Sequence, residues 1–119
     1  MRVLLATDRP HLGDALSFFL GERHVDVVAV AGDAHELLEL ALSTHPVVVL
    51  VDWQLAETDP AGILADLKRC EQPAHVIVMC SAEERPLAQM AAADGYVTLG
   101  DPPEALLDVL RDVTITAGR

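Results

Sequence analysis

Five short runs of aliphatic residues alternate along the chain with segments of helical character, and this alternation limits the possible folds most strongly. The runs are rich in β-branched side chains, which favour strands. They cover residues 3–6, 25–31, 47–51, 76–80 and 96–98. Because the runs are apolar almost throughout, we expect both faces of each strand to be buried, as in a parallel sheet.

The intervening segments carry apolar residues at helical spacing. Leu12, Leu16 and Phe19 fall on one face of the first segment. In the second, Asp33 precedes Glu36 by three residues, which is a capping-box pattern. We therefore expect helices within residues 11–21, 33–43, 62–70, 83–93 and 101–113.

Strands and helices in this order predict an α/β fold with a five-stranded, doubly wound parallel sheet. The 119 residues suit one domain. Hydrophobic residues make up 51% of the chain, which is enough for a core without cross-links. We find no linker, internal repeat or low-complexity segment.

Composition excludes several classes of function. A formal net charge of −11 disfavours direct binding to DNA or to anionic lipid. No apolar run is long enough to span a membrane. The N-terminal run is too short for a signal peptide, so we expect a cytoplasmic protein. The two cysteines, Cys70 and Cys80, do not suggest a disulfide framework.

Polar side chains follow the apolar runs at the points where three of the predicted strands end. Thr7 and Asp8 follow the first run, Asp52 the third and Ser81 the fourth. The carboxyl ends of parallel strands meet at one edge, where such folds place their sites. Two carboxylates there suit Mg²⁺, beside which one carboxylate can accept a phosphoryl group. The hydroxyl of Ser81 could then bind a phosphoryl oxygen.

Four segments resemble the receiver domain of a bacterial two-component response regulator, most closely the LuxR/NarL-type class of transcription regulators. They are RVLLATDRP, VVVLVDWQLAETDP, VIVMCSAEE and AADGYVTLGDPPEALLDVL. The resemblance covers essentially the whole chain and implies a flavodoxin-like fold. It also implies that residues 1–119 form a single receiver domain, and that the helix-turn-helix effector domain, through which such regulators bind DNA, is absent from this chain.

The resemblance implies a role for each matching residue. Asp52 matches the phospho-acceptor, and Asp8 matches an acid that helps to hold Mg²⁺. The backbone carbonyl of Gln54 would complete the metal site. Ser81 matches the hydroxyl that turns toward the phosphoryl group, and Tyr96 matches the aromatic residue that changes rotamer on activation.

Two departures from the family pattern affect the predicted site directly. Thr7 stands where the family has a second acid, and Leu99 stands where it has a lysine that pairs with the phosphoryl group. Thr7 should weaken the Mg²⁺ site, and Leu99 removes a cation that would face the added negative charge. Arg9 could reach over as a substitute, but we expect it to be exposed to solvent. We expect Trp53 to cover the acidic pocket or to make a surface contact.

The favoured function is therefore a phosphorylated, Mg²⁺-binding receiver that takes its phosphoryl group from a histidine kinase. The alternative is an atypical receiver that does not depend on phosphate and is fixed in one state or gated by a ligand or partner. An enzyme such as a phosphatase is a third class, but the chain has no insertion large enough for a substrate cap. We also expect a homodimer through residues 84–113, because the segment PLAQMAAADGY carries little charge.

Overall fold

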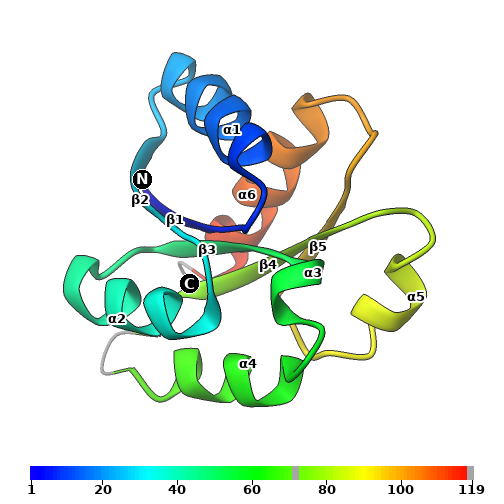
Figure 1. Cartoon of the computed structure of the whole chain (residues 1–119). Coiled ribbons are helices and arrows are strands. Elements are labelled where there is room, and N and C mark those ends of the chain that lie inside the picture. The colour runs from blue at the N-terminus through cyan, green and yellow to red at the C-terminus, as the bar shows by residue number, and fades with distance from the viewer. Residues whose placement is uncertain (71–72, 118–119) are drawn as a thin grey trace.

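The computed structural model describes residues 1–70 and 73–117, and it confirms the predicted α/β fold (Figure 1). Five parallel strands form one sheet in the order β2-β1-β3-β4-β5, which is the flavodoxin-like order. The strands are β1 (Arg2–Ala6), β2 (Asp26–Ala31), β3 (Val48–Asp52), β4 (His75–Cys80) and β5 (Gly95–Thr98). The winding direction reverses between β1 and β3, which places the switch point of the fold at their carboxyl ends.

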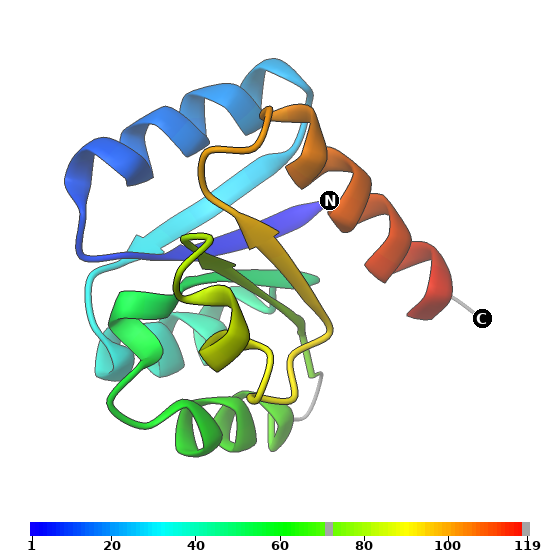
Figure 2. The ribbon, with the colours of Figure 1, turned by 90° about the vertical axis from the view of Figure 1, so that its right-hand side faces the viewer.

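Helices cover both faces of the sheet. The helices are α1 (Pro10–Glu22), α2 (Ala34–Thr44), α3 (Trp53–Ala56), α4 (Pro60–Lys68), α5 (Arg85–Ala88) and α6 (Glu104–Ala117). Helices α1 and α6 lie on one face, and α2 and α4 lie on the other (Figures 1 and 2). Within the described residues, no helix is long and apolar enough to cross a membrane.

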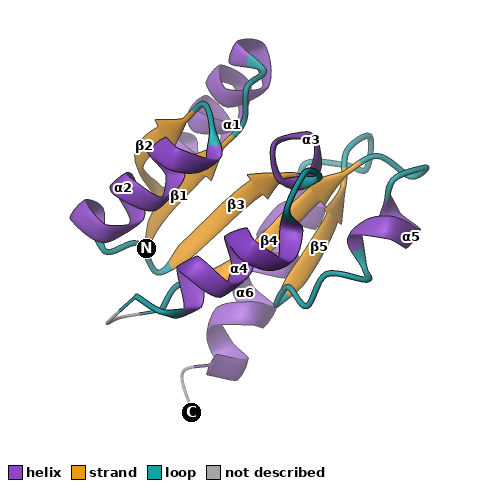
Figure 3. Ribbon diagram, turned by 60° about the horizontal axis from the view of Figure 1, so that its bottom comes forward, coloured by secondary structure: helices purple, strands orange, loops and turns teal. Residues whose placement is uncertain are grey.

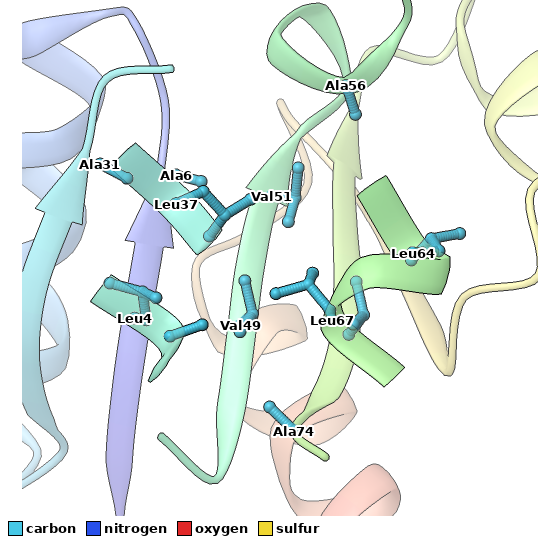
Figure 4. Close-up of a cluster of buried hydrophobic side chains, with 12 residues drawn as sticks. Leu4, Ala6, Ala31, Leu37, Val49, Val51, Ala56, Leu64, Leu67 and Ala74 are labelled. Carbon is cyan, nitrogen blue, oxygen red and sulfur yellow. The ribbon is translucent and has the colours of Figure 1, made fainter. Parts of the chain in front are cut away.

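Side chains of the central strand alternate between two cores. Val49 and Val51 point into the core beneath α2 and α4, which Figure 4 shows with Leu37 and Leu67. Residues of the opposite parity, such as Leu50, belong to the core beneath α1 and α6. Burial on both faces explains why the strand sequences are continuously apolar.

The capping pattern at the start of α2 is confirmed in the structure. The Asp33 carboxylate accepts a hydrogen bond from the backbone N–H of Glu36, at 2.7 Å. The Glu36 carboxylate reaches back and accepts from the N–H of Gly32, at 2.8 Å. The first bond satisfies a donor that a helix N-terminus leaves unpaired, and the second ties the residue before the cap to the first turn.

The helix expected over residues 83–93 is wrong in extent, since α5 is a single turn from Arg85 to Ala88. The Tyr96 hydroxyl explains where helical bonding stops. It donates to the carbonyl of Ala91 and accepts from the N–H of Ala93, so a side chain takes backbone groups beyond the turn.

The one-turn helix α3 had no counterpart among the predicted helices. It begins directly after β3, where an Asp52 carboxylate oxygen accepts from the backbone N–H of Gln54 and so caps the turn. Of the two roles predicted for Trp53, the surface contact is wrong, because its side chain is buried with Val78, Cys80 and Ala88. Asp52 is thus both the last residue of β3 and the N-cap of α3.

Candidate functional site

Asp52 is the centre of the candidate site. It ends β3 at the sheet edge toward which the strand arrows point, beside α3 (Figure 3). Its side chain is 0% exposed, and it is one of only two buried polar residues in the described part of the chain, the other being Thr7. A fully buried carboxylate is costly unless charge and hydrogen bonds compensate it.

Three neighbouring residues supply that compensation. The hydroxyl of Thr7 donates to Oδ2 of Asp52 at 2.9 Å. The guanidinium of Arg9 donates from Nε to the same oxygen at 2.8 Å. Its Nη2 also lies 2.8 Å from Oδ2, and the two residues form an ion pair. The other oxygen, Oδ1, accepts from the backbone N–H of Gln54 at 3.2 Å.

Thr7 also orients this arrangement. Its hydroxyl oxygen accepts a hydrogen bond from the backbone N–H of Arg9 at 3.1 Å. With that lone pair occupied, the hydroxyl proton is directed toward Asp52. The threonine therefore fixes both the turn that follows β1 and the carboxylate that ends β3.

Arg9, which we expected to be exposed to solvent, is only partly exposed and reaches over to Asp52. Its side chain is 40% exposed, because the guanidinium bends inward onto Asp52 while part of the side chain stays at the surface. Nη2 is buried and makes no well-aligned hydrogen bond, so it contributes mainly charge. The physical reason for the contact is the buried carboxylate of Asp52, whose charge needs a nearby cation, and the family's lysine is replaced by Leu99.

The predicted metal ligands do not form a magnesium site in this arrangement. Asp8 is exposed and, in the described residues, makes no hydrogen bond or ion pair. Gln54 contacts Asp52 through its backbone N–H, and the metal-binding role of its carbonyl stays a prediction. Mg²⁺ needs oxygen ligands at about 2.0–2.1 Å in octahedral geometry, whereas hydrogen-bond donors and a guanidinium already surround Oδ2. The residues therefore do not fit Mg²⁺ as they stand.

Ser81 lies at the end of β4, but its hydroxyl is used locally. Oγ accepts from the N–H of Glu84 at 3.1 Å, while the Glu84 carboxylate accepts from the N–H of Ser81 at 2.9 Å. This reciprocal pair resembles a capping box and holds the loop before α5. In the described residues, Ser81 makes no hydrogen bond to Asp52.

The two remaining site residues take part in packing. Tyr96 packs against the core cluster that contains Trp53, and its hydroxyl is bonded to backbone between α5 and β5. Leu99 is half-buried against the core beneath α1 and α6, and it lines an apolar cavity of about 200 Å³ that also contacts Phe19. An aliphatic side chain that packs against the core therefore occupies the position where the family has a lysine.

A second arginine at this edge was also missed from the sequence. Arg85 donates from Nη1 to the hydroxyl of Thr98, directly before Leu99. Burial raises the pKa of the nearby Cys80 thiol, and Arg85 offsets part of that rise. Cys80 therefore stays protonated at neutral pH and supplies no thiolate nucleophile.

Comparison with known families and proteins is consistent with this architecture. The family model for the response regulator receiver domain matches residues 3–106. YxjL, an uncharacterized transcriptional regulatory protein of Bacillus subtilis, is 27% identical over 115 residues. That alignment covers 93% of this chain but 53% of YxjL, so the chain spans about half the length of this relative.

Solved structures agree in fold. The receiver domain of AraT, a response regulator from Geobacillus stearothermophilus, is 28% identical, with a TM-score of 0.80 over 98% of this chain and 95% of that chain. A LuxR-family DNA-binding response regulator from Staphylococcus aureus has a TM-score of 0.79 over 94% of this chain and 97% of that chain. Its identity is 18%, so this likeness concerns the fold alone.

Proposed function

Because this chain belongs to the receiver domains of two-component response regulators, we propose that it is an atypical receiver whose output does not depend on phosphorylation of Asp52. The observation that carries the proposal is the ion pair between Arg9 and the fully buried Asp52. The chain then serves in signalling rather than as an enzyme, and its relatives point to transcription regulation.

Phosphoryl transfer requires a carboxylate oxygen that is free to attack phosphorus. In this protein Oδ2 of Asp52 faces the Thr7 hydroxyl and the Arg9 guanidinium, and Oδ1 faces a backbone N–H. The side chain has no exposed surface from which a phosphoryl donor could approach. Arg9 would have to move away before the reaction could begin. The buried carboxylate of Asp52 would then be left without its counter-charge, which is energetically costly.

The product would also lack stabilisation. A phosphoryl group adds about −1.5 to −2 charge at neutral pH. Receiver domains typically bind Mg²⁺ at their acidic phosphorylation site, but here Thr7 is uncharged and Leu99 is half-buried among apolar residues. The cations available at this edge, Arg9 and Arg85, are already bonded to Asp52 and Thr98.

One observation favours the phosphorylated receiver as the second candidate function. Asp52, Ser81 and Tyr96 lie at the ends of neighbouring strands and in the middle of β5, where the family pattern expects them. If Asp52 accepts a phosphoryl group, Mg²⁺ and a histidine kinase are required, and Arg9 could turn to the phosphoryl oxygens. Ligand gating and a cytoplasmic location remain predictions.

Intact-mass measurement after incubation with acetyl phosphate and Mg²⁺ separates the two functions. We expect no phosphoryl adduct on the wild-type chain. A Thr7→Asp/Arg9→Ala/Leu99→Lys variant, which restores the acid and the lysine of the family pattern and removes the guanidinium paired with Asp52, is the positive control. A wild-type adduct that Asp52→Asn abolishes would contradict the proposal and support the second function.

We further propose that the chain self-associates through the surface formed by residues 84–113. Leu87 is 59% exposed and Met90 is 83% exposed, on and just after α5. These apolar side chains in a segment of low charge suit a self-contact. DNA binding would then require an effector domain outside residues 1–119. Sedimentation velocity tests the contact: we expect dimer at high concentration that Leu87→Glu disrupts, and monomer throughout would contradict it.

A further inference from the structure

We infer that the Arg9 guanidinium is the resident cation of this site and that it excludes divalent metal ions from the carboxylate of Asp52. This inference deepens the proposed function, since it concerns the same residues. A receiver domain can fail to be phosphorylated for reasons unrelated to metal binding. In this protein, the Arg9 side chain alone decides whether a guanidinium or a divalent metal ion occupies the space beside Asp52.

Geometry supports mutual exclusion. Nε and Nη2 of Arg9 both lie 2.8 Å from the same oxygen, Oδ2 of Asp52. A metal ion bound to that oxygen would approach to about 2.0–2.1 Å and carry its own waters. Both cannot occupy the space in front of Oδ2, into which the Thr7 hydroxyl also projects at 2.9 Å.

Electrostatics points in the same direction. A guanidinium carries its charge at any physiological pH. The carboxylate of Asp52 therefore always has a positive charge beside it while Arg9 stays in place. A divalent cation entering beside it would meet like-charge repulsion in a partly buried setting, where screening is weak. The energy of binding would also have to replace the ion pair that stabilises the buried Asp52.

Removing the Arg9 side chain should allow a divalent metal ion to bind beside Asp52. Asp52 would then be a buried carboxylate without a counter-charge, and Asp8 follows β1 at the same edge. Oxygen ligands of this kind favour hard divalent cations such as Mg²⁺ and Mn²⁺. Among the side chains that the family uses to hold the metal, only the acid that Thr7 replaces would then be missing.

Line broadening by Mn²⁺ in the amide spectrum measures this change at the site itself. Site-resolved detection is needed because a chain of net charge −11 attracts cations over its whole surface. We expect amides around Asp52 to broaden in Arg9→Met at about tenfold lower Mn²⁺ than in the wild type, with reversal by excess Mg²⁺. Arg111→Met is the matched control, since Arg111 also pairs with a carboxylate, that of Asp108 at 3.0 Å.

Any of three results in these titrations would overturn the inference. The first is broadening near Asp52 in the wild type at the same Mn²⁺ concentration as in Arg9→Met. The second is a folded Arg9→Met protein that shows no broadening there, and the third is a gain in broadening that Arg111→Met reproduces. Phosphorylation does not enter these titrations, so the inference and the proposed function can fail separately.

A wild-type measurement decides the matter if Arg9→Met does not fold. The Nε–H resonance of Arg9 should be protected from solvent exchange by its bond to Asp52. We expect this resonance to keep its position and protection through a Mg²⁺ titration. Its loss or displacement by Mg²⁺, while the distant Arg111 resonance stays unchanged, would show that metal displaces the guanidinium and would overturn the inference.

Discussion

A buried carboxylate dominates the energetics of the site at the scale of single residues. Asp52 has no exposed surface, and its charge is balanced within the chain by Arg9, the Thr7 hydroxyl and one backbone N–H. Breaking a buried pair by removing one partner is far more damaging than replacing both, because the remaining charge is left uncompensated. This asymmetry gives a direct test of the contact.

We predict that Arg9→Met lowers the free energy of unfolding by about 2–3 kcal/mol, below the usual range for a fully buried pair because Arg9 is partly exposed. Asp52→Asn should partly rescue Arg9→Met in the double variant, since the uncompensated charge is then gone. Urea denaturation of the four proteins measures the coupling. Additive effects of the two substitutions would contradict a direct interaction.

The sequence predicted correctly that Asp52 ends a strand and that Asp8 and Ser81 follow strand ends, because strand ends follow from the apolar runs. The roles of these residues and of Tyr96 in phosphorylation stay predictions. It did not reveal where Arg9 points, since a long side chain beside a turn can extend into solvent or fold inward. The available signal was the combination of substitutions: a buried aspartate that has lost an acid partner and a lysine requires another cation. Only the packed structure shows which arginine meets that requirement.

At the scale of elements, two helix ends adopt backbone conformations that glycine tolerates better than histidine. His45 caps α2 in the left-handed region with φ of 49°, and its N–H bonds to the carbonyl of Ala41. His24, which lies just after the end of α1, also has a positive φ, of 62°. Residues with a Cβ are strained there, whereas glycine is not.

His45→Gly should therefore raise the free energy of unfolding by about 0.5–1 kcal/mol. The same substitution inside the same helix, His35→Gly, should lower it by a similar amount because glycine is a poor helix former. Thermal unfolding of both variants provides the comparison. Destabilisation by His45→Gly would show that histidine contributes a contact that offsets the strain.

The packing of β5 against α6 depends on the absence of a side chain at Gly95. A Cβ there would lie 2.9 Å from Cγ1 of Val109 and 3.1 Å from Cγ2 of Val113. We predict that Gly95→Ala costs about 1–3 kcal/mol because α6 must shift. Gly21→Ala is the control, since its Cβ would meet nothing within 4 Å, and its stability should be unchanged or higher in the same urea titration.

Elements were predictable to the extent that local pattern decides them. Five strands and the α2 cap followed from apolar runs and from the Asp33–Glu36 spacing. The short α5 did not, because the Tyr96 hydroxyl that bonds Ala91 and Ala93 comes from the next strand. Helix α3 depends on Asp52 as a cap, and a strand-end aspartate gives no sign of that second use.

At the scale of the whole molecule, the receiver fold is retained while the chemistry of its functional edge has changed. The strand order and doubly wound helices place Asp52 at the switch point between β1 and β3. Yet Leu99 packs beside an apolar cavity and Arg9 neutralises the central carboxylate. In this structure, the carboxylate at the centre of this edge is already paired with a cation of the same chain, Arg9.

Amide spectra of the wild-type chain with Mg²⁺ and beryllofluoride, a phosphoryl mimic, test this conclusion most directly. The mimic needs a free aspartate oxygen and a bound metal, and both are absent if Arg9 holds Asp52. We predict unchanged resonances for Ser81, Thr98 and the residues around Asp52 at saturating mimic. Saturable shifts at these positions, lost in Asp52→Asn, would contradict the phosphorylation-independent receiver.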